Sequence, residues 1–164
     1  MTATDREWFE EEEFWERYAP IMFDEARWAE VPAVVDGLAK LTGIGPASRV
    51  LDVCCGLGRV SVELAARGYG VTGVDITRSY LRAAQESCED EGLSIELVCE
   101  DARRFVRPNS FDLAVNLYIS FGYFEDPDDD ALLCRNVRAS LVNGGSFVIE
   151  TVGKEIAMRD FIDG

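Results

Sequence analysis

The sequence predicts an α/β protein in which a doubly wound, mainly parallel sheet of about five strands carries helices on both faces. From residue 48 onward, short apolar runs alternate with stretches of helical periodicity, and this rhythm is typical of parallel βαβ units. Glycine, proline and asparagine mark the boundaries between these segments. A chain of 164 residues with 48% hydrophobic residues can bury one sizeable core, which agrees with a single α/β domain.

Helices are expected to precede the alternating region. The first thirty residues hold ten acidic residues and all three tryptophans. Aromatic residues recur there at spacings of four and seven, which predicts an acidic helix with one aromatic face; they are Trp8, Phe14, Trp15 and Tyr18. Pro20 is expected to end this helix. A second helix is expected over residues 25–41, with a break at Pro32.

The later elements follow in order. Strands are expected over residues 49–53, 69–74, 94–99, 111–117 and 146–151. The first helix between them follows a glycine-rich turn and closes at Gly68, and the second runs from an N-cap at Thr77 to about Asp90. A third begins at Asp126, where an N-cap precedes a proline, and is expected to stop at residues 143–145. In such sheets the ligand lies beyond the carboxyl ends of the strands.

Composition excludes several classes of function. Lys and Arg number 16 against 31 Asp and Glu, so the formal net charge is −15, which disfavours binding to nucleic acid and to anionic membranes. The sequence has no histidine, so serine–histidine and cysteine–histidine catalysis are excluded and no metal site is expected. Five cysteines form an odd set, and no leader or membrane-spanning segment is evident; we therefore expect a cytoplasmic, reduced protein.

Short polar residues lie where the expected strands end. Asp52 ends the first strand, and a turn of small residues, Cys54 to Gly58, leads into a helix whose N–H groups can face a ligand. Asp75 ends the second strand, where a carboxylate can accept both hydroxyls of a ribose. Asp101 follows the third strand and Asn116 lies near the end of the fourth.

With this set of residues the chain resembles the class I S-adenosylmethionine-dependent methyltransferases, which have a Rossmann-like fold. The resemblance covers about residues 48–151 and looks nearest to small bacterial enzymes of this class that act on small molecules. It lies in the ordered segments 51–59, 73–75, 100–102, 111–114 and 141–145, with residues 120–124 as further support. It implies methyl transfer by in-line displacement to a small-molecule acceptor, with S-adenosyl-L-methionine as cofactor and S-adenosyl-L-homocysteine as product.

For the methionine end of the cofactor, the resemblance implies roles for the first strand and its turn. The backbone around Cys54, Gly56 and Gly58 would line the methionine portion. Asp52 would lie beneath it and orient the turn, or the ammonium through water. Asn116 would bring its backbone carbonyl close to the methionine and to the transferring methyl.

For the nucleoside end, the resemblance implies roles for the second and third strand ends. Asp75 would hold the ribose hydroxyls, and Ile76 would lie against the adenine. Asp101 would accept a hydrogen bond from the adenine amino group, and the N–H of Ala102 would donate to the ring.

The acceptor side is expected to involve aromatic residues. Tyr118 and Tyr123 follow the fourth strand and, with Asn116, are the catalytic candidates. The N-terminal aromatic helix, particularly Tyr18 and Phe23, is expected to fold over the cofactor as a lid, so that residues 1–46 form a cap and residues 47–164 the core. Arg59 is expected to be a surface arginine, with pairing to a ligand carboxylate as the alternative.

Two rival functions are open. Ser61 stands where the dinucleotide motif G-x-G-x-x-G has its last glycine, so a nicotinamide-dependent oxidoreductase is an alternative. A non-catalytic partner subunit with the same fold is another.

The sequence departs from the family pattern in two places. Cys54 replaces a glycine and is expected to keep an ordinary negative φ. The chain stops soon after the expected fifth strand, whose bare edge would be an aggregation hazard. We expect either that the chain is part of a longer protein, that a second copy in a homodimer or another partner covers the edge, or that the missing segment is dispensable.

Overall fold

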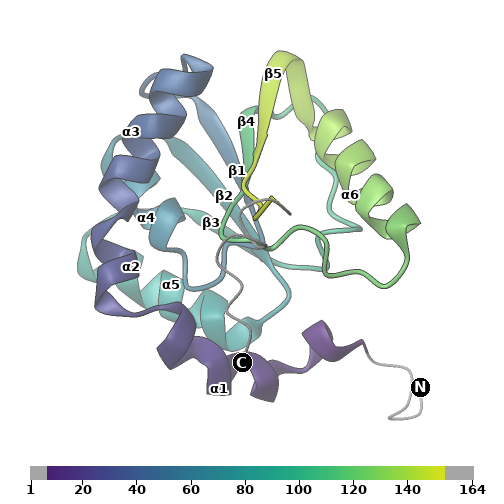
Figure 1. Ribbon diagram of the computed structural model, residues 1–164. Helices are drawn as coiled ribbons and strands as arrows, with labels where there is room; N and C mark the ends of the chain where they lie inside the picture. Colours follow the sequence, from purple (N-terminus) through teal and green to yellow (C-terminus); the bar gives the residue numbers. More distant parts are fainter. Residues whose placement is uncertain (1–6, 154–164) are drawn as a thin grey trace.

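The computed structural model describes residues 7–153 and contains one five-stranded parallel sheet (Figure 1). The strands lie in the order β3-β2-β1-β4-β5, and every neighbouring pair is parallel. Their bounds are β1 Arg49–Val53, β2 Gly70–Asp75, β3 Glu96–Cys99, β4 Phe111–Asn116 and β5 Leu141–Ile149. The strand order reverses between β1 and β4, so a ligand crevice is expected at the carboxyl ends of these two central strands.

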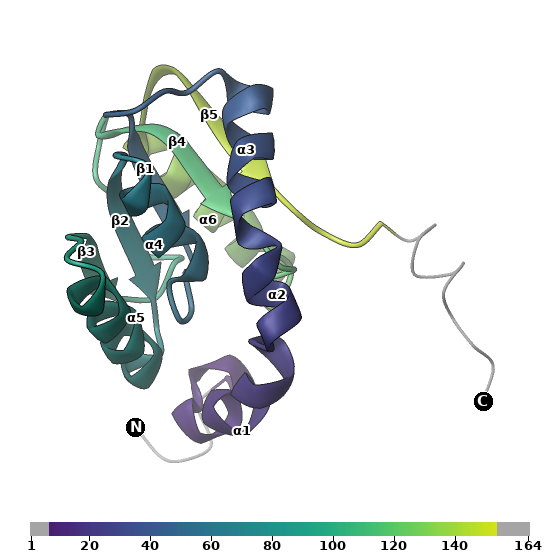
Figure 2. The same cartoon turned by 90° about the vertical axis from the view of Figure 1, so that its left-hand side faces the viewer.

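Helices cover both faces of the sheet, as the sequence predicted (Figures 1 and 2). Helices α3, α4 and α5 cover one face and α6 covers the other. The helical elements are η1 Trp8–Glu10, α1 Glu12–Met22, α2 Glu25–Ala29, α3 Val31–Thr42, α4 Arg59–Ala66, α5 Arg78–Asp90 and α6 Pro127–Ser140. Within residues 7–153 none of these helices is long and apolar enough to cross a membrane.

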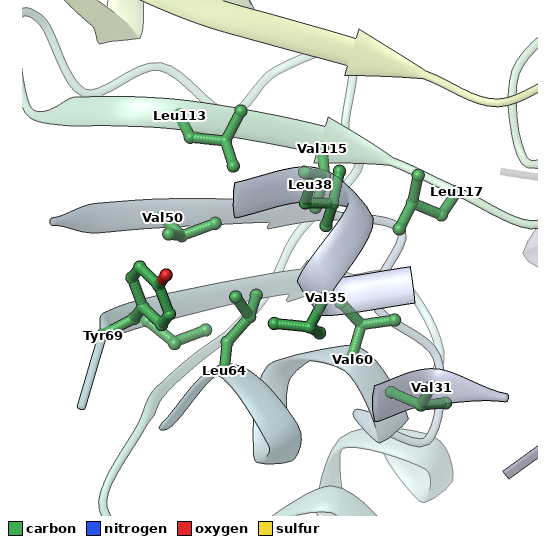
Figure 3. Packing of buried hydrophobic residues seen from close by; sticks show 11 residues of the cluster. Val31, Val35, Leu38, Val50, Val60, Leu64, Tyr69, Leu113, Val115 and Leu117 are labelled. Atoms are coloured by element: carbon green, nitrogen blue, oxygen red, sulfur yellow. The ribbon is translucent and has the colours of Figure 1, made fainter. Parts of the chain in front are cut away.

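Two apolar clusters hold the layers together. On one face, Val35, Leu38 and Leu64 of α3 and α4 pack against Val50 and Leu113 of the sheet (Figure 3). On the other face, the central strands pack against Leu133 and Val137 of α6 and against Phe105. Both faces of β1 and β4 are therefore buried, which explains why these strands are mainly apolar.

The N-terminal helices differ from the prediction in one respect. Pro20 lies inside α1, which continues to Met22. The proline removes one backbone hydrogen bond from the helix, which ends two residues later. The break expected at Pro32 is confirmed, because α2 ends at Ala29 and Pro32 occupies the first turn of α3.

Helix α1 lies beside the N-terminal end of α5, at the carboxyl edge of the sheet (Figure 2). The backbone N–H of Ser79, at the start of α5, donates to the Glu12 carboxylate at 2.6 Å, and the Tyr80 hydroxyl donates to the carbonyl of Trp15. These contacts hold the aromatic helix over the edge where the ligand is expected.

Helix α6 begins as predicted and ends earlier than predicted. The Asp126 side chain caps it by accepting from the N–H of Asp128 at 2.9 Å. The helix ends at Ser140, and the next residue already belongs to β5. Pairing with β4 jumps from Leu141 to Ser146, so the Asn-Gly-Gly segment forms a bulge inside the strand, with Gly144 at φ +83°, and does not stop the helix.

Candidate functional site

A pocket opens at the carboxyl ends of the strands, beneath the N-terminal aromatic segment. Its volume is about 110 Å³. Its floor comes from the strand ends and the turn after β1: Asp52, Cys54, Cys55, Gly56, Asp75, Ile76, Glu100, Asp101 and Ala102. Its roof and far wall are mainly aromatic and include Phe9, Trp15, Phe23, Tyr80, Tyr118, Tyr123 and Phe124.

The turn between β1 and α4 is built from three residues with positive φ. Cys54 has φ +61°, Gly56 +56° and Gly58 +74°. The expectation that Cys54 would keep a negative φ is wrong; the left-handed conformation is strained for a cysteine, and such strain is characteristic of functional turns. At Gly58 a side chain is excluded on steric grounds as well, because a Cβ would lie 2.7 Å from the Cβ of Ala84. This glycine therefore lets α4 pack closely against α5.

Asp75 joins this turn to the end of β2. Its two carboxylate oxygens accept from the backbone N–H groups of Gly56 and Thr77, each at 2.8 Å. Burial raises the pKa of Asp75, although these hydrogen bonds oppose the rise. A carboxylate has about four acceptor positions, so Asp75 can fix the turn and still accept hydrogen bonds from a ligand.

Asp52 lies under the turn and is 4% exposed. Burial raises its pKa from 3.8 to about 7, against the effect of the Ser61 hydroxyl, which donates to it at 2.7 Å. The charge of Arg59 also lowers this pKa, but burial outweighs it, and within residues 7–153 no cation forms an ion pair with Asp52. A ligand with a positive group above the turn would supply one.

Asp101 is held by an arginine. Arg103 donates to it through the backbone N–H at 2.9 Å and through Nη2 at 2.7 Å. Burial opposes ionisation of Asp101, but these bonds outweigh it and lower the pKa of the carboxyl. The guanidinium also contacts the carboxylates of Asp129 at 2.7 Å and Glu7 at 2.9 Å.

The structure brings most of the predicted site residues together. Nine of them line the pocket: Asp52, Cys54, Gly56, Asp75, Ile76, Asp101, Ala102, Tyr118 and Tyr123. Three do not. Gly58 precedes α4 and lies against Ala84 of α5, outside the lining. Tyr18 is 47% exposed and stacks on Phe14 with ring centres 4.7 Å apart.

Asn116 is the third residue outside the lining. It is fully buried, and its Nδ2 donates to the carbonyl of Val53 at 3.0 Å. Its own carbonyl accepts from the N–H of Glu150 at 2.9 Å. Its Oδ1 has no hydrogen-bond partner in the part of the chain that the structure describes. The side chain therefore ties the ends of β1 and β4 together directly behind the turn.

Sequence reasoning missed part of the wall. Trp15 was predicted only as a member of an aromatic face and Phe9 was given no role, yet both line the pocket. The Nε1 of Trp15 donates to the carbonyl of Phe9 at 2.7 Å. Arg59 also lines the pocket and is 5% exposed, so the expectation of a surface arginine is wrong. Its position directly after Gly58, at the start of a helix facing the site, was the available signal.

A known family accounts for this arrangement. The sequence profile of the methyltransferase domain matches residues 50–145, which is more than half of the chain. The chain belongs to the methyltransferase-domain family. The match spans the turn after β1, Asp75, Asp101 and both central strands, so it covers the floor of the pocket. S-adenosylmethionine is accordingly the cofactor that this site is built to take, as the resemblance implied.

Curated relatives of the methyltransferase domain differ in what they modify. The 23S rRNA (uracil-C5)-methyltransferase RlmD of Bordetella pertussis is 31% identical over 108 residues, which are 66% of this chain and 22% of that protein. The ubiquinone biosynthesis O-methyltransferase of Coxiella burnetii is 30% identical over 106 residues, 64% of this chain and 44% of that protein. The chain thus spans less than half the length of either relative.

Solved structures share the fold. An S-adenosylmethionine-dependent methyltransferase from Clostridium acetobutylicum superposes with a TM-score of 0.69 at 22% identity, over 84% of this chain and 55% of that protein. The Rossmann-like methyltransferase fold predicted from the sequence is confirmed.

Proposed function

We propose that this chain catalyses methyl transfer from S-adenosylmethionine to a small-molecule acceptor. The observation that carries the proposal is the meeting of Asp52, Asp75 and Asp101 around one glycine-containing turn at the switch point of the sheet. Each acid comes from a different strand end. A dinucleotide site explains Asp75 alone, whereas a cofactor with a ribose, an adenine and a cationic amino-acid end uses all three.

The pocket's polar groups fit this cofactor. Asp75 would accept the ribose hydroxyls, with Ile76 and the Ala102 N–H beside the adenine and Asp101 near its amino group. Asp52, whose pKa is raised by burial, is suited to a nearby cationic group. When bound, S-adenosylmethionine supplies a methyl group on a positively charged sulfur, which makes the methyl reactive without further activation.

The chain's own contribution is alignment and exclusion of water. Aromatic rings form a roof over the floor of the pocket, and Tyr123 lies against Trp8 with ring centres 5.2 Å apart. Burial raises the pKa values of Tyr118 and Tyr123, so both phenols are neutral at physiological pH. They would orient an acceptor by hydrogen bonding and by ring contact, and would not act as ready-made bases.

A small molecule suits the site better than RNA. The net charge of −15 repels a polyanion, and acidic side chains, Glu7 and Glu10, lie beside Arg103 at the aromatic roof. The same proposal divides the chain into a cap, residues 1–46, and a core, residues 47–164. RNA methylation, the activity of one relative, is the alternative, and a basic surface would be needed for it.

Calorimetric titration tests the proposal. We expect S-adenosylhomocysteine to bind with micromolar affinity, and NAD not to bind. Asp75→Ala should abolish binding, whereas Asp90→Ala, an exposed acid at the far end of α5, should leave it unchanged. Binding of NAD alone, or binding that survives Asp75→Ala, would contradict the assignment. Formation of S-adenosylhomocysteine from S-adenosylmethionine with amine and hydroxyl acceptors then separates an enzyme from a non-catalytic binding subunit.

A further inference from the structure

Arg59 is a buried cation that forms no ion pair within the described part of the chain. It is the first residue of α4, directly after the turn, and is 5% exposed. Its Nη1 is fully buried, and among residues 7–153 it has neither a hydrogen-bond partner nor a carboxylate in ion-pair contact. Desolvation lowers its pKa. A buried guanidinium with an unsatisfied N–H is destabilising unless a ligand satisfies it.

Aromatic rings fix the orientation of this side chain. The guanidinium carbon lies 3.4 Å from the centre of the Tyr118 ring and 5.2 Å from that of Phe23. Tyr118 and Ile119 both have positive φ, +58° and +66°, and the N–H of Tyr118 donates to the Glu150 carboxylate at 3.0 Å. A strained turn thus places a ring against the face of Arg59. Stacking uses the face of the guanidinium and leaves its planar N–H edge available.

The charges that line the pocket indicate which kind of ligand group the N–H edge of Arg59 would bind. Among the described lining residues Arg59 is the single cationic side chain, against four acidic ones, Asp52, Asp75, Glu100 and Asp101. Arg59 and Asp52 are near enough to influence each other's pKa. A ligand with a cationic and an anionic end would meet an opposite charge at each.

We propose that Arg59 binds a carboxylate of the ligand in this pocket, through the N–H edge that its aromatic stack leaves free. The inference rests on the proposed function. The carboxylate comes either from the amino-acid end of the cofactor or from the methyl acceptor, and both sources offer the same planar pair of oxygens to the guanidinium.

The first arm of the test uses a pair of ligands that differ only in the carboxylate. Calorimetry compares S-adenosylhomocysteine with its decarboxylated form, S-adenosyl-3-thiopropylamine, on wild type and on Arg59→Gln. If the cofactor supplies the carboxylate, wild type prefers S-adenosylhomocysteine by about 10- to 100-fold, the usual effect of a charged hydrogen-bonded pair, and the variant loses this preference. Unchanged binding of the decarboxylated ligand shows that the variant pocket is intact.

The second arm addresses the acceptor. Benzoate and benzamide are titrated into wild type and Arg59→Gln, both free and saturated with S-adenosylhomocysteine. If wild type binds benzoate but not benzamide, and Arg59→Gln binds neither, the carboxylate belongs to the acceptor. Arg59→Lys should restore part of either effect. Arg27→Gln removes a neighbouring exposed arginine that does not line the pocket, and should change neither.

The outcomes separate the two proposals. If wild type binds S-adenosylhomocysteine and Arg59→Gln alters neither the ligand preference nor benzoate binding, Arg59 has no carboxylate to bind and the inference fails while the proposed function stands. If wild type does not bind S-adenosylhomocysteine, the proposed function fails, and the benzoate arm on the free protein decides the role of Arg59 by itself.

Discussion

Arg103 and Asp101 form an ion pair in which the arginine Nη2 lies 2.7 Å from the aspartate Oδ2, and the two side chains are only 13% and 10% exposed. The same guanidinium reaches Glu7 beside η1 and Asp129 on α6. It also lies over the rings of Phe9 and Phe124, at 5.3 and 4.8 Å. One arginine therefore joins Asp101 after β3, the N-terminal segment and helix α6.

Replacing this arginine should loosen the N-terminal segment. In Arg103→Gln, four acidic side chains lose their shared cation: Glu7, Glu10, Asp101 and Asp129. We expect the free energy of unfolding to fall by about 2 kcal/mol, below the 3–5 kcal/mol typical of a fully buried pair because solvent reaches this one. Urea denaturation measures the loss. Arg17→Gln breaks an exposed pair with Glu13 and should change stability by less than about 0.5 kcal/mol. Equal effects of the two variants would contradict the role of Arg103.

A methyl group at Gly58 should be poorly tolerated. Gly58→Ala places a Cβ 2.7 Å from that of Ala84 at a residue with φ +74°, and we expect a loss of about 2–4 kcal/mol of unfolding free energy. Gly92→Ala is the matched control, because its φ is +67° and nothing lies within 4 Å of the added atom; backbone strain alone should cost it about 1 kcal/mol. Similar losses in the two variants would show that α4 and α5 are not in close contact at Gly58.

The sheet and its floor residues could be predicted because they depend on local patterns. Asp52, Asp75 and Asp101 each follow an apolar run, and parallel strands bring such positions to one edge. The roof could not be predicted in the same way. Whether Tyr18 or Trp15 faces the pocket depends on how α1 rotates against α5, and that is decided by tertiary contacts such as the bond from Ser79 to Glu12. The burial of Arg59 likewise depends on Tyr118, whose left-handed backbone no local pattern indicated.

The contribution of Asp52 to the free energy of unfolding should fall as the pH rises from about 4 to about 7. Burial raises the pKa of this carboxyl from 3.8 to about 7, so between these values the folded state keeps a proton that the unfolded state has lost. The contribution of Asp52 therefore weakens from about pH 4 to about pH 7 and is constant above, a change of at most about 4 kcal/mol. Asp52→Asn, which keeps the shape and cannot ionise, should gain stability relative to wild type over this range.

Paired denaturation curves at pH 4.5, 6 and 7.5 measure that difference. The exposed substitution Asp90→Asn corrects for the general effect of removing one negative charge. A stability difference between Asp52→Asn and wild type that stays constant across the three pH values would show that Asp52 is ionised throughout. With S-adenosylhomocysteine present the pH dependence should flatten, because the ligand's ammonium group would favour the charged carboxylate.

The tryptophans offer a direct report on whether the N-terminal cap covers the bound cofactor. Trp15 lines the pocket and stacks near Tyr123, with ring centres 6.0 Å apart, whereas Trp28 lies outside the lining and is 36% exposed. A ligand that fills the pocket displaces water from one side of the Trp15 ring, so titration with S-adenosylhomocysteine should shift the emission of the protein to shorter wavelength. Trp15→Phe should remove most of this change, and Trp28→Phe should leave it. If the signal instead disappears with Trp28, the segment from η1 to α2 moves as a body when the ligand binds, and the roof seen above the strand ends is not the arrangement of the loaded protein.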